Sequence, residues 1–87
     1  MKNFLSAIVF VLSPGWLFAG PVDINAADAE TIALELNGVG VARAQAIVDY
    51  RNEYGRFQTE DDLLNVGGIG PHILEVNRTN IVIGQER

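Results

Sequence analysis

Two short glycine motifs carry the clearest chemical signal in this sequence. They are Gly38-Val39-Gly40 and, thirty residues later, Gly68-Ile69-Gly70. Paired glycines let a turn adopt positive φ angles and approach another surface closely, because no Cβ stands in the way. The aliphatic residue between them can turn inward while neighbouring N–H groups point outward, beside the positive end of a following helix. Such a turn favours an anion such as a phosphate group.

The two glycine motifs belong to a longer internal repeat. Residues 34–40 align with residues 64–70, and both copies read apolar, variable, apolar, variable, Gly, aliphatic, Gly. Helical signals flank each copy, so the sequence predicts an all-α fold, a tandem helix-hairpin-helix with four short helices. Motif 1 spans about residues 29–54 and motif 2 about residues 60–78. A single Gly-x-Gly turn could merely connect two helices. Its duplication, with an inward-turned aliphatic residue (the plug) in each copy, favours phosphate binding.

The helices of motif 1 have recognisable ends. The first should begin near Ala29, with Asp28 as its N-cap. The second should run from Val41 to about Tyr54, where Gly55 supplies a left-handed residue that ends it.

The helices of motif 2 are shorter. Thr59 and Asp62 resemble a capping box, so a third helix should begin near Glu60. Pro71 suits the first position of a fourth helix. Residues 81–83 are predicted to be an extended strap, and residues 20–25 a lead-in. The apolar and aromatic side chains expected in the core include Ala44, Ile47, Val48, Tyr50, Tyr54, Phe57, Ile73, Leu74 and Val76.

The first nineteen residues read as a secretory signal peptide. Lys2 and the amino terminus form a basic start, an apolar run covers residues 4–12, and Ala19 offers a cleavage site. The alternative is an uncleaved membrane anchor, but Pro14-Gly15 interrupts the run well short of the roughly 20 apolar residues a span needs. The domain is therefore expected at residues 20–87.

The exported part is acidic. The whole chain carries a net charge of −5, and removal of Lys2 leaves five arginines against eleven acidic residues, a net charge of −6. This balance argues against long-range attraction to nucleic acid. All eleven acidic residues, however, avoid residues 36–48 and 63–74, the stretches that contain the glycine motifs.

Enzymatic chemistry is poorly supplied. After residue 19 the chain has no Ser, no Cys and one His, so the usual nucleophile–base pairs and metal clusters cannot be assembled. We therefore expect a non-enzyme with no catalytic residues, no metal site and no cofactor, whose fold depends on packing alone.

The exported chain resembles the ComEA family of competence proteins, in its short form with one module. The matching residues are Val22-Asp23-Ile24-Asn25, Gly38-Val39-Gly40, residues 44–51, Gly55-Arg56-Phe57, residues 62–66 and Gly68-Ile69-Gly70-Pro71. The resemblance implies a periplasmic protein that binds double-stranded DNA without sequence preference and helps draw it in during natural transformation. The resemblance also implies that the protein could have partners in the DNA-uptake machinery or among envelope proteins.

The chain departs from the ComEA pattern around its hairpins. Val41 replaces a common proline, Gly67 and His72 stand where lysine is common, and Arg43 is retained. His72 could contact phosphate if protonated, or be a solvated residue at a helix start. The residues predicted to contact DNA are Gly38, Val39, Gly40, Val41, Arg43, Gly68, Ile69, Gly70 and His72.

The other arginines and the rival function stay open. Arg56 and Arg78 are further candidates for phosphate contacts, whereas Arg51 is expected to be structural and to pair with a carboxylate. In the alternative interpretation the same double hairpin grips another protein, as a scaffold or interaction module of an envelope or secretion-related assembly. The acidic charge favours that alternative.

Overall fold

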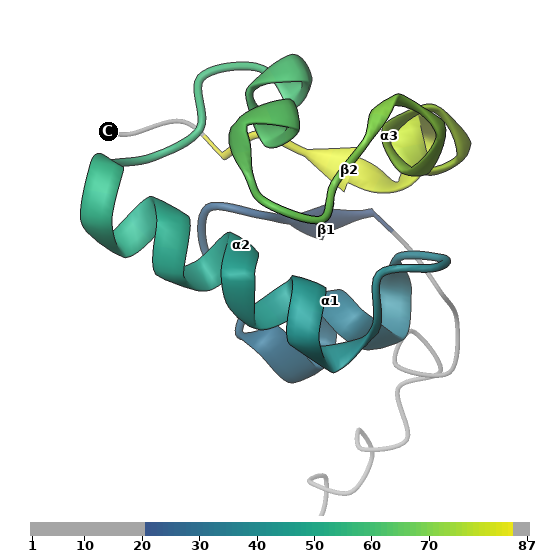
Figure 1. Cartoon of the computed structure of the whole chain (residues 1–87), viewed down its shortest axis with the longest axis horizontal. Coiled ribbons are helices and arrows are strands. Elements are labelled where there is room, and N and C mark those ends of the chain that lie inside the picture. The colour runs from purple at the N-terminus through teal and green to yellow at the C-terminus, as the bar shows by residue number, and fades with distance from the viewer. Residues whose placement is uncertain (1–20, 85–87) are drawn as a thin grey trace, which may run out of the picture.

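Two helical hairpins, joined by a pair of very short strands, make up the fold (Figure 1). The computed structural model describes residues 21–84, so the predicted signal peptide lies outside the described residues. The elements in chain order are β1 (Val22–Asp23), α1 (Ala29–Glu35), α2 (Gly40–Tyr54), the 3-10 helix η3 (Glu60–Asn65), α3 (Pro71–Asn77), the 3-10 turn η4 (Arg78–Asn80) and β2 (Ile81–Val82). In Figure 1 the α1–α2 pair lies below the strands, and η3 and α3 lie above them.

Motif 1 begins and ends where the sequence predicts. The side chain of Asp28 accepts a hydrogen bond of 2.8 Å from the amide of Thr31, which caps α1. This hydrogen bond is the largest of the effects that hold the pKa of Asp28 below its ordinary value. At the other end of the motif, Gly55 has a φ of 102° and terminates α2. A side chain there would be strained, so the glycine fixes the length of the helix.

Motif 2 follows the same plan with shorter helices. The predicted capping box is present: the Thr59 hydroxyl accepts from the Asp62 amide, and the Asp62 carboxylate accepts from the amides of Gln58 and Thr59. The segment that follows is a 3-10 helix rather than an α-helix. It has six residues before the chain turns into Gly67-Gly68, and the 3-10 form is common in such short helical pieces. Pro71 occupies the first turn of α3, as expected.

The capping box makes part of the fold's stability dependent on pH. The amides of Gln58 and then Thr59 hold the pKa of Asp62 below its ordinary value of 3.8. A carboxyl whose pKa is lower in the folded state stabilises that state above the unfolded pKa, and this contribution is lost as the pH falls through the folded value. We expect the urea concentration at the midpoint of unfolding to decrease as the pH falls below about 4. This decrease should be smaller in Asp62→Asn. An unchanged acid profile in Asp62→Asn would contradict the assignment.

The two strands add one feature to the helical fold that the sequence predicts. The lead-in and the strap are not separate extended segments, because β1 and β2 pair in parallel, with Val22 opposite Ile81 and Asp23 opposite Val82. The amide of Ile24 extends the pairing by donating to the carbonyl of Val82 at 3.2 Å. The fold is otherwise helical, and this pair closes it by joining the two ends of the described chain.

Asn25 ties the lead-in to the segments that follow the two motifs. Its Oδ1 accepts from the amide of Phe57 at 2.7 Å, while its Nδ2 donates to the carbonyls of Phe57 and Gly84. The side chain thus pairs with the peptide of Phe57 as a neighbouring strand would. It connects the segment before α1 with the segment that leaves α2.

A single hydrophobic core lies between the two motifs. The buried apolar side chains are Val22, Ile24, Ile32, Leu36, Val39, Ala44, Ile47, Phe57, Leu63, Val66, Ile69, Leu74 and Ile81. Val48, Tyr50 and Ile73 are partly buried against them. Among the described residues, no helix is long and apolar enough to cross a membrane.

Two side chains predicted to lie in the core are exposed instead. Val76 is 46% exposed because the buried position of its helical turn, three residues after Leu74, is taken by Asn77. Tyr54 is 68% exposed. It lies at the end of α2 and covers Tyr50, with ring centroids 4.7 Å apart, while Tyr50 stacks on the buried Phe57.

Candidate nucleic-acid interface

Hairpin 1, which we define as residues 38–40, has the backbone that its sequence predicts. Gly38 and Gly40 have φ angles of 77° and 69°, a region that residues with a side chain rarely adopt. Val39 between them is 1% exposed and points into the core, whereas both glycines lie at the surface. The first N–H groups of α2 follow directly and have no acceptor within that helix. The turn therefore presents glycine backbone and amide donors together.

Hairpin 2, residues 68–70, resembles hairpin 1 but is not identical to it. Gly68 has a φ of 94° and Ile69 is 5% exposed, so the glycine turn and the buried plug are both present. Gly70, however, has a φ of −105° and a ψ of −179°. It precedes Pro71, which forces the residue before it into extended backbone. The backbone angles at position 70 thus do not require a glycine, whereas those of Gly40 in hairpin 1 do.

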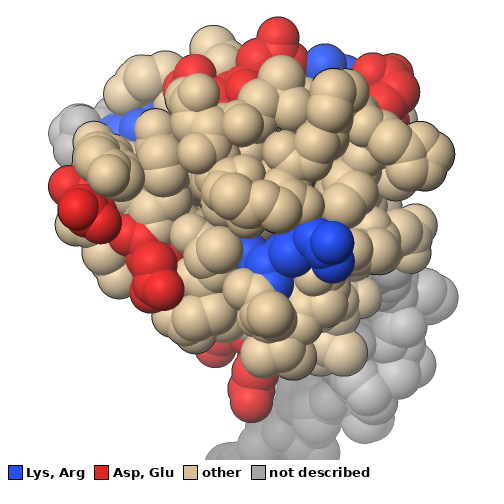
Figure 2. All heavy atoms as spheres, in the orientation of Figure 1, with Lys and Arg blue, Asp and Glu red and all other residues tan. Residues whose placement is uncertain are grey.

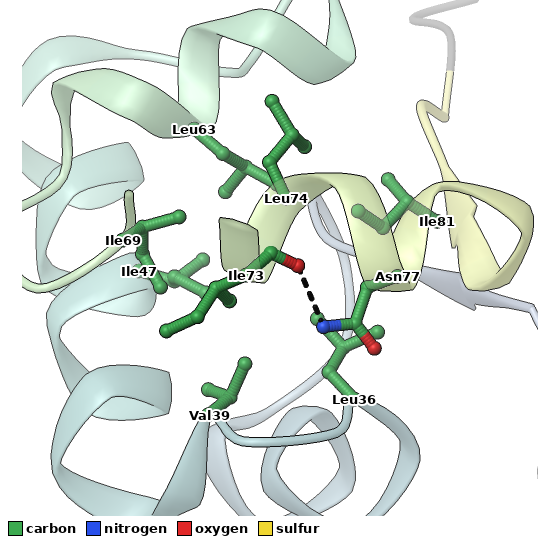
Figure 3. A pocket seen from close by; sticks show the side chains of 9 residues that line it. All are labelled: Leu36, Val39, Ile47, Leu63, Ile69, Ile73, Leu74, Asn77 and Ile81. Carbon is green, nitrogen blue, oxygen red and sulfur yellow. Dashed lines mark hydrogen bonds between the residues drawn. The ribbon is translucent and has the colours of Figure 1, made fainter. Parts of the chain in front are cut away.

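The plugs of the two hairpins meet in the same part of the core. Val39 and Ile69 both line a cavity of about 10 Å³, together with side chains from α2, η3 and α3. Figure 3 shows the two plugs pointing toward this space, with Ile47 and Ile73 between them. Because close-packed interiors resist deformation, the shared contacts limit movement of one hairpin relative to the other.

Arg43 connects α2 to hairpin 2. Its Nε donates a hydrogen bond of 2.7 Å to the carbonyl oxygen of Gly68. Its aliphatic part lies against the same glycine, since a Cβ on Gly68 would be 3.2 Å from the Arg43 Cγ. The terminal nitrogens of the guanidinium have no hydrogen bond or ion pair with residues 21–84. Arg43 therefore places a free positive charge beside hairpin 2 while starting from the helix of hairpin 1.

The charges around the hairpins are unevenly distributed. Figure 2 shows basic atoms in the middle of a broad uncharged face, over α2 and the turn that leads into α3, with acidic atoms toward its margins. Arg43 is the arginine that the hydrogen bonds place at hairpin 2, and Glu30 lines the groove beside Gly40 and Val41 at hairpin 1.

The remaining predicted contact residues are accessible. Val41 is 65% exposed in the first turn of α2, and His72 is exposed in the first turn of α3. Neither makes a side-chain hydrogen bond or ion pair with residues 21–84. Sequence reasoning missed Asn77, which is discussed below, because its partner lies forty residues away in the chain.

The other three arginines of the described chain lie elsewhere or are engaged. Arg78 forms ion pairs with Asp61, Glu75 and Glu60 at 2.9–3.0 Å, which raise its pKa further above its ordinary value. It is therefore not free for phosphate. Arg56 follows the far end of α2, about 22 Å along that helix from hairpin 1.

Arg51 is structural, as expected, but it pairs with a carbonyl instead of a carboxylate. Its Nη1 donates to the carbonyl oxygen of Ile24 at 2.8 Å and so fixes the lead-in against α2. Within residues 21–84, no three acidic or histidine side chains are grouped to hold a metal ion.

Comparison with known proteins agrees with this geometry. A family model described as a helix-hairpin-helix motif matches residues 18–82. An uncharacterised protein of Haemophilus influenzae is 44% identical over 61 residues, which are 70% of this chain and 54% of that protein. ComE operon protein 1 of Bacillus subtilis is 42% identical over 62 residues, which are 71% of this chain and 30% of that protein.

These relatives are longer than the region they share with this chain. The chain spans about half of the Haemophilus influenzae protein and less than a third of the Bacillus subtilis protein. The family match itself covers most of the chain and includes both hairpins, β1 and β2. The chain belongs to the helix-hairpin-helix family, as a ComEA-like member.

Proposed function

We propose that the protein binds double-stranded DNA through the backbone of its two hairpins, without sequence preference. The observation that carries this proposal is the presence of two glycine turns in one small domain, with the guanidinium of Arg43, which starts from the helix after hairpin 1, beside hairpin 2. Contacts made by backbone amides and one arginine reach phosphates and leave base edges unread. Binding would therefore depend on the shape and charge of the duplex backbone.

The binding should be weak for a single module. The face offers one free arginine, and the chain as a whole is acidic. With about two to four phosphate contacts, the logarithm of the binding constant should fall with the logarithm of salt concentration at a slope of about −2 to −4. A lone module would thus hold DNA at low salt and release it readily at higher salt.

Titration of the purified protein with a fluorescent duplex, at several salt concentrations and with two unrelated sequences, tests the proposal. We expect equal affinities for the two sequences and the salt slope given above. Absence of binding at low salt would refute DNA binding by the isolated protein.

Arg43→Ala should weaken binding alike for both sequences and reduce the salt slope by about one. Arg56→Ala is the matched control, because it removes the same charge at the far end of α2, where it should leave the affinity unchanged. Equal losses in the two variants would mean that net charge, and not the hairpin face, governs binding.

The cellular setting is part of the same proposal. The signal-peptide pattern of residues 1–19 supports export, and the resemblance to ComEA proteins supports a non-enzymatic role in DNA uptake in the periplasm. Fractionation of cells expressing the protein would test its location. Deletion of the gene followed by a transformation assay would test its role in uptake, and an undiminished transformation frequency would contradict it.

One observation favours a second function, the binding of another protein. Leu34 is 81% exposed and lies with Val41, Ala33 and Gly40 along an open groove of about 470 Å³ that is bordered by Glu30. Exposed aliphatic side chains in a groove are typical of interaction surfaces. Leu34→Gln removes the exposed aliphatic side chain without adding a negative charge beside Gly40 and Val41, so it should leave duplex binding intact. Loss of the cellular phenotype in this variant would then favour a protein partner.

A further inference from the structure

The hairpin that precedes α2 is held by a residue from the opposite motif. Asn77, at the end of α3, is 1% exposed and is the one buried polar side chain in residues 21–84. Its Oδ1 accepts from the amide of Asn37 at 2.7 Å, and its Nδ2 donates to the carbonyl of Asn37 at 2.9 Å. A further bond from Nδ2 to the carbonyl of Ile73, drawn in Figure 3, fixes the orientation of the side chain. Asn37 directly precedes hairpin 1.

The reverse connection is made by Arg43. This residue of motif 1 bonds to the Gly68 carbonyl in hairpin 2, as described above. The residue before hairpin 1 and the first residue of hairpin 2 are therefore each attached, through the backbone, to a side chain on the second helix of the other motif. Neither attachment is needed to form a glycine turn, since the positive φ angles already do so. Both attachments instead determine where one turn lies relative to the other.

A fixed separation matters if the two hairpins bind at the same time. When one site is engaged, the second meets its partner at a high effective concentration only if the geometry allows both contacts. A duplex presents phosphates at regular, rigid separations, whereas a single strand must lose conformational freedom to present two phosphates at the same separation. A pair of hairpins held at one distance would therefore distinguish the two forms of DNA.

We infer that Asn77 and Arg43 are positioning residues that set the distance between the hairpins, and that this distance gives the protein its preference for duplex over single-stranded DNA. The inference rests on the proposed function. It assigns duplex selectivity to two hydrogen-bonding side chains, one of which is buried and cannot touch DNA.

The test is a cycle of variants with both forms of DNA. Asn77→Leu keeps a similar volume but removes both bonds to Asn37, which is an exposed residue, and the bond to Ile73 within the helix. Gly70→Glu disables hairpin 2 with charge and bulk, and it should fold, because Gly70 has ordinary extended angles and no atom lies within 4 Å of its added Cβ. Dissociation constants for duplex and single strand are measured at low salt for the wild type, both variants and the double variant.

We expect Asn77→Leu to weaken duplex binding by at least about tenfold and to change single-strand binding by less than about twofold. In the Gly70→Glu background, the same substitution should have little further effect, because the second site is already lost. Equal losses for both DNA forms, or equal losses in both backgrounds, would show that Asn77 only stabilises the fold and would overturn the inference.

Two further arms separate the possible failures. If Asn77→Leu does not fold, Arg43→Lys applies the same test at an exposed position, because it keeps the charge and loses the planar Nε donor to Gly68. Arg43→Lys should lower the preference for duplex over single-stranded DNA. An unchanged preference would overturn the inference. A wild type that binds neither form of DNA contradicts the proposed function itself. A wild type that binds both forms equally contradicts the positioning role alone.

Discussion

Replacement of Gly40 by valine is expected to abolish duplex binding. Gly40 has a φ of 69°, and a β-branched residue in this region costs about 1–3 kcal/mol if the backbone keeps its shape. The turn can avoid that cost by changing shape, and the amides at the start of α2 then lose their alignment. Either outcome should lower the affinity by more than tenfold and reduce the free energy of unfolding by about the same 1–3 kcal/mol.

Gly70→Ala is the matched control for Gly40→Val at the equivalent position of hairpin 2. Gly70 has ordinary extended angles, and an added Cβ would meet no atom within 4 Å. Its stability should stay within about 0.5 kcal/mol of the wild type. Affinity is measured by fluorescence anisotropy and stability by urea unfolding. If Gly40→Val bound duplex as well as the wild type does, hairpin 1 would not be part of the binding surface.

Replacement of Phe57 by alanine should remove a large part of the protein's free energy of unfolding. Phe57 is 1% exposed and is the largest of the fully buried side chains among the described residues. It stacks on Tyr50 with ring centroids 5.3 Å apart. Removing a buried phenylalanine costs about 3–5 kcal/mol. A domain of this size has a total stability of only about 3–10 kcal/mol, at 0.05–0.15 kcal/mol per residue.

Tyr54→Ala is the control for Phe57→Ala, because it removes a neighbouring aromatic ring that is 68% exposed. It should cost less than about 1 kcal/mol, the value typical of an exposed contact. Circular dichroism during thermal unfolding measures both variants. A Phe57→Ala protein as stable as Tyr54→Ala would mean that the core tolerates the cavity by collapsing around it.

The features that sequence predicted correctly are those encoded by neighbouring residues. The cap at Asp28, the box of Thr59 and Asp62, the stop at Gly55 and the start at Pro71 each depend on a few consecutive positions. The Gly-aliphatic-Gly pattern likewise contains its own turn and plug. These local signals were sufficient to predict the helical hairpins.

The features that sequence did not predict depend on distant parts of the chain. Two strands of two residues have no periodicity to detect, and their pairing exists only because the helices bring residues 22–23 and 81–82 together. The same is true of Asn77, whose partner is in the other motif, and of Arg78, whose charge is neutralised by residues of η3 and α3. Charge counts along the chain could not distinguish the engaged Arg78 from the free Arg43.

The closure of the fold by β1 and β2 has a consequence for the order in which it forms. Helix caps and glycine turns involve close neighbours and can form within microseconds, whereas the strand pair must join segments 59 residues apart. Because such a distant contact is entropically costly before the helices have shortened the path between its ends, it should be a late event. A chain emerging residue by residue from a ribosome or a translocation channel would hold both hairpins in rudimentary form. It would become a finished domain only when residues 81–82 had been released.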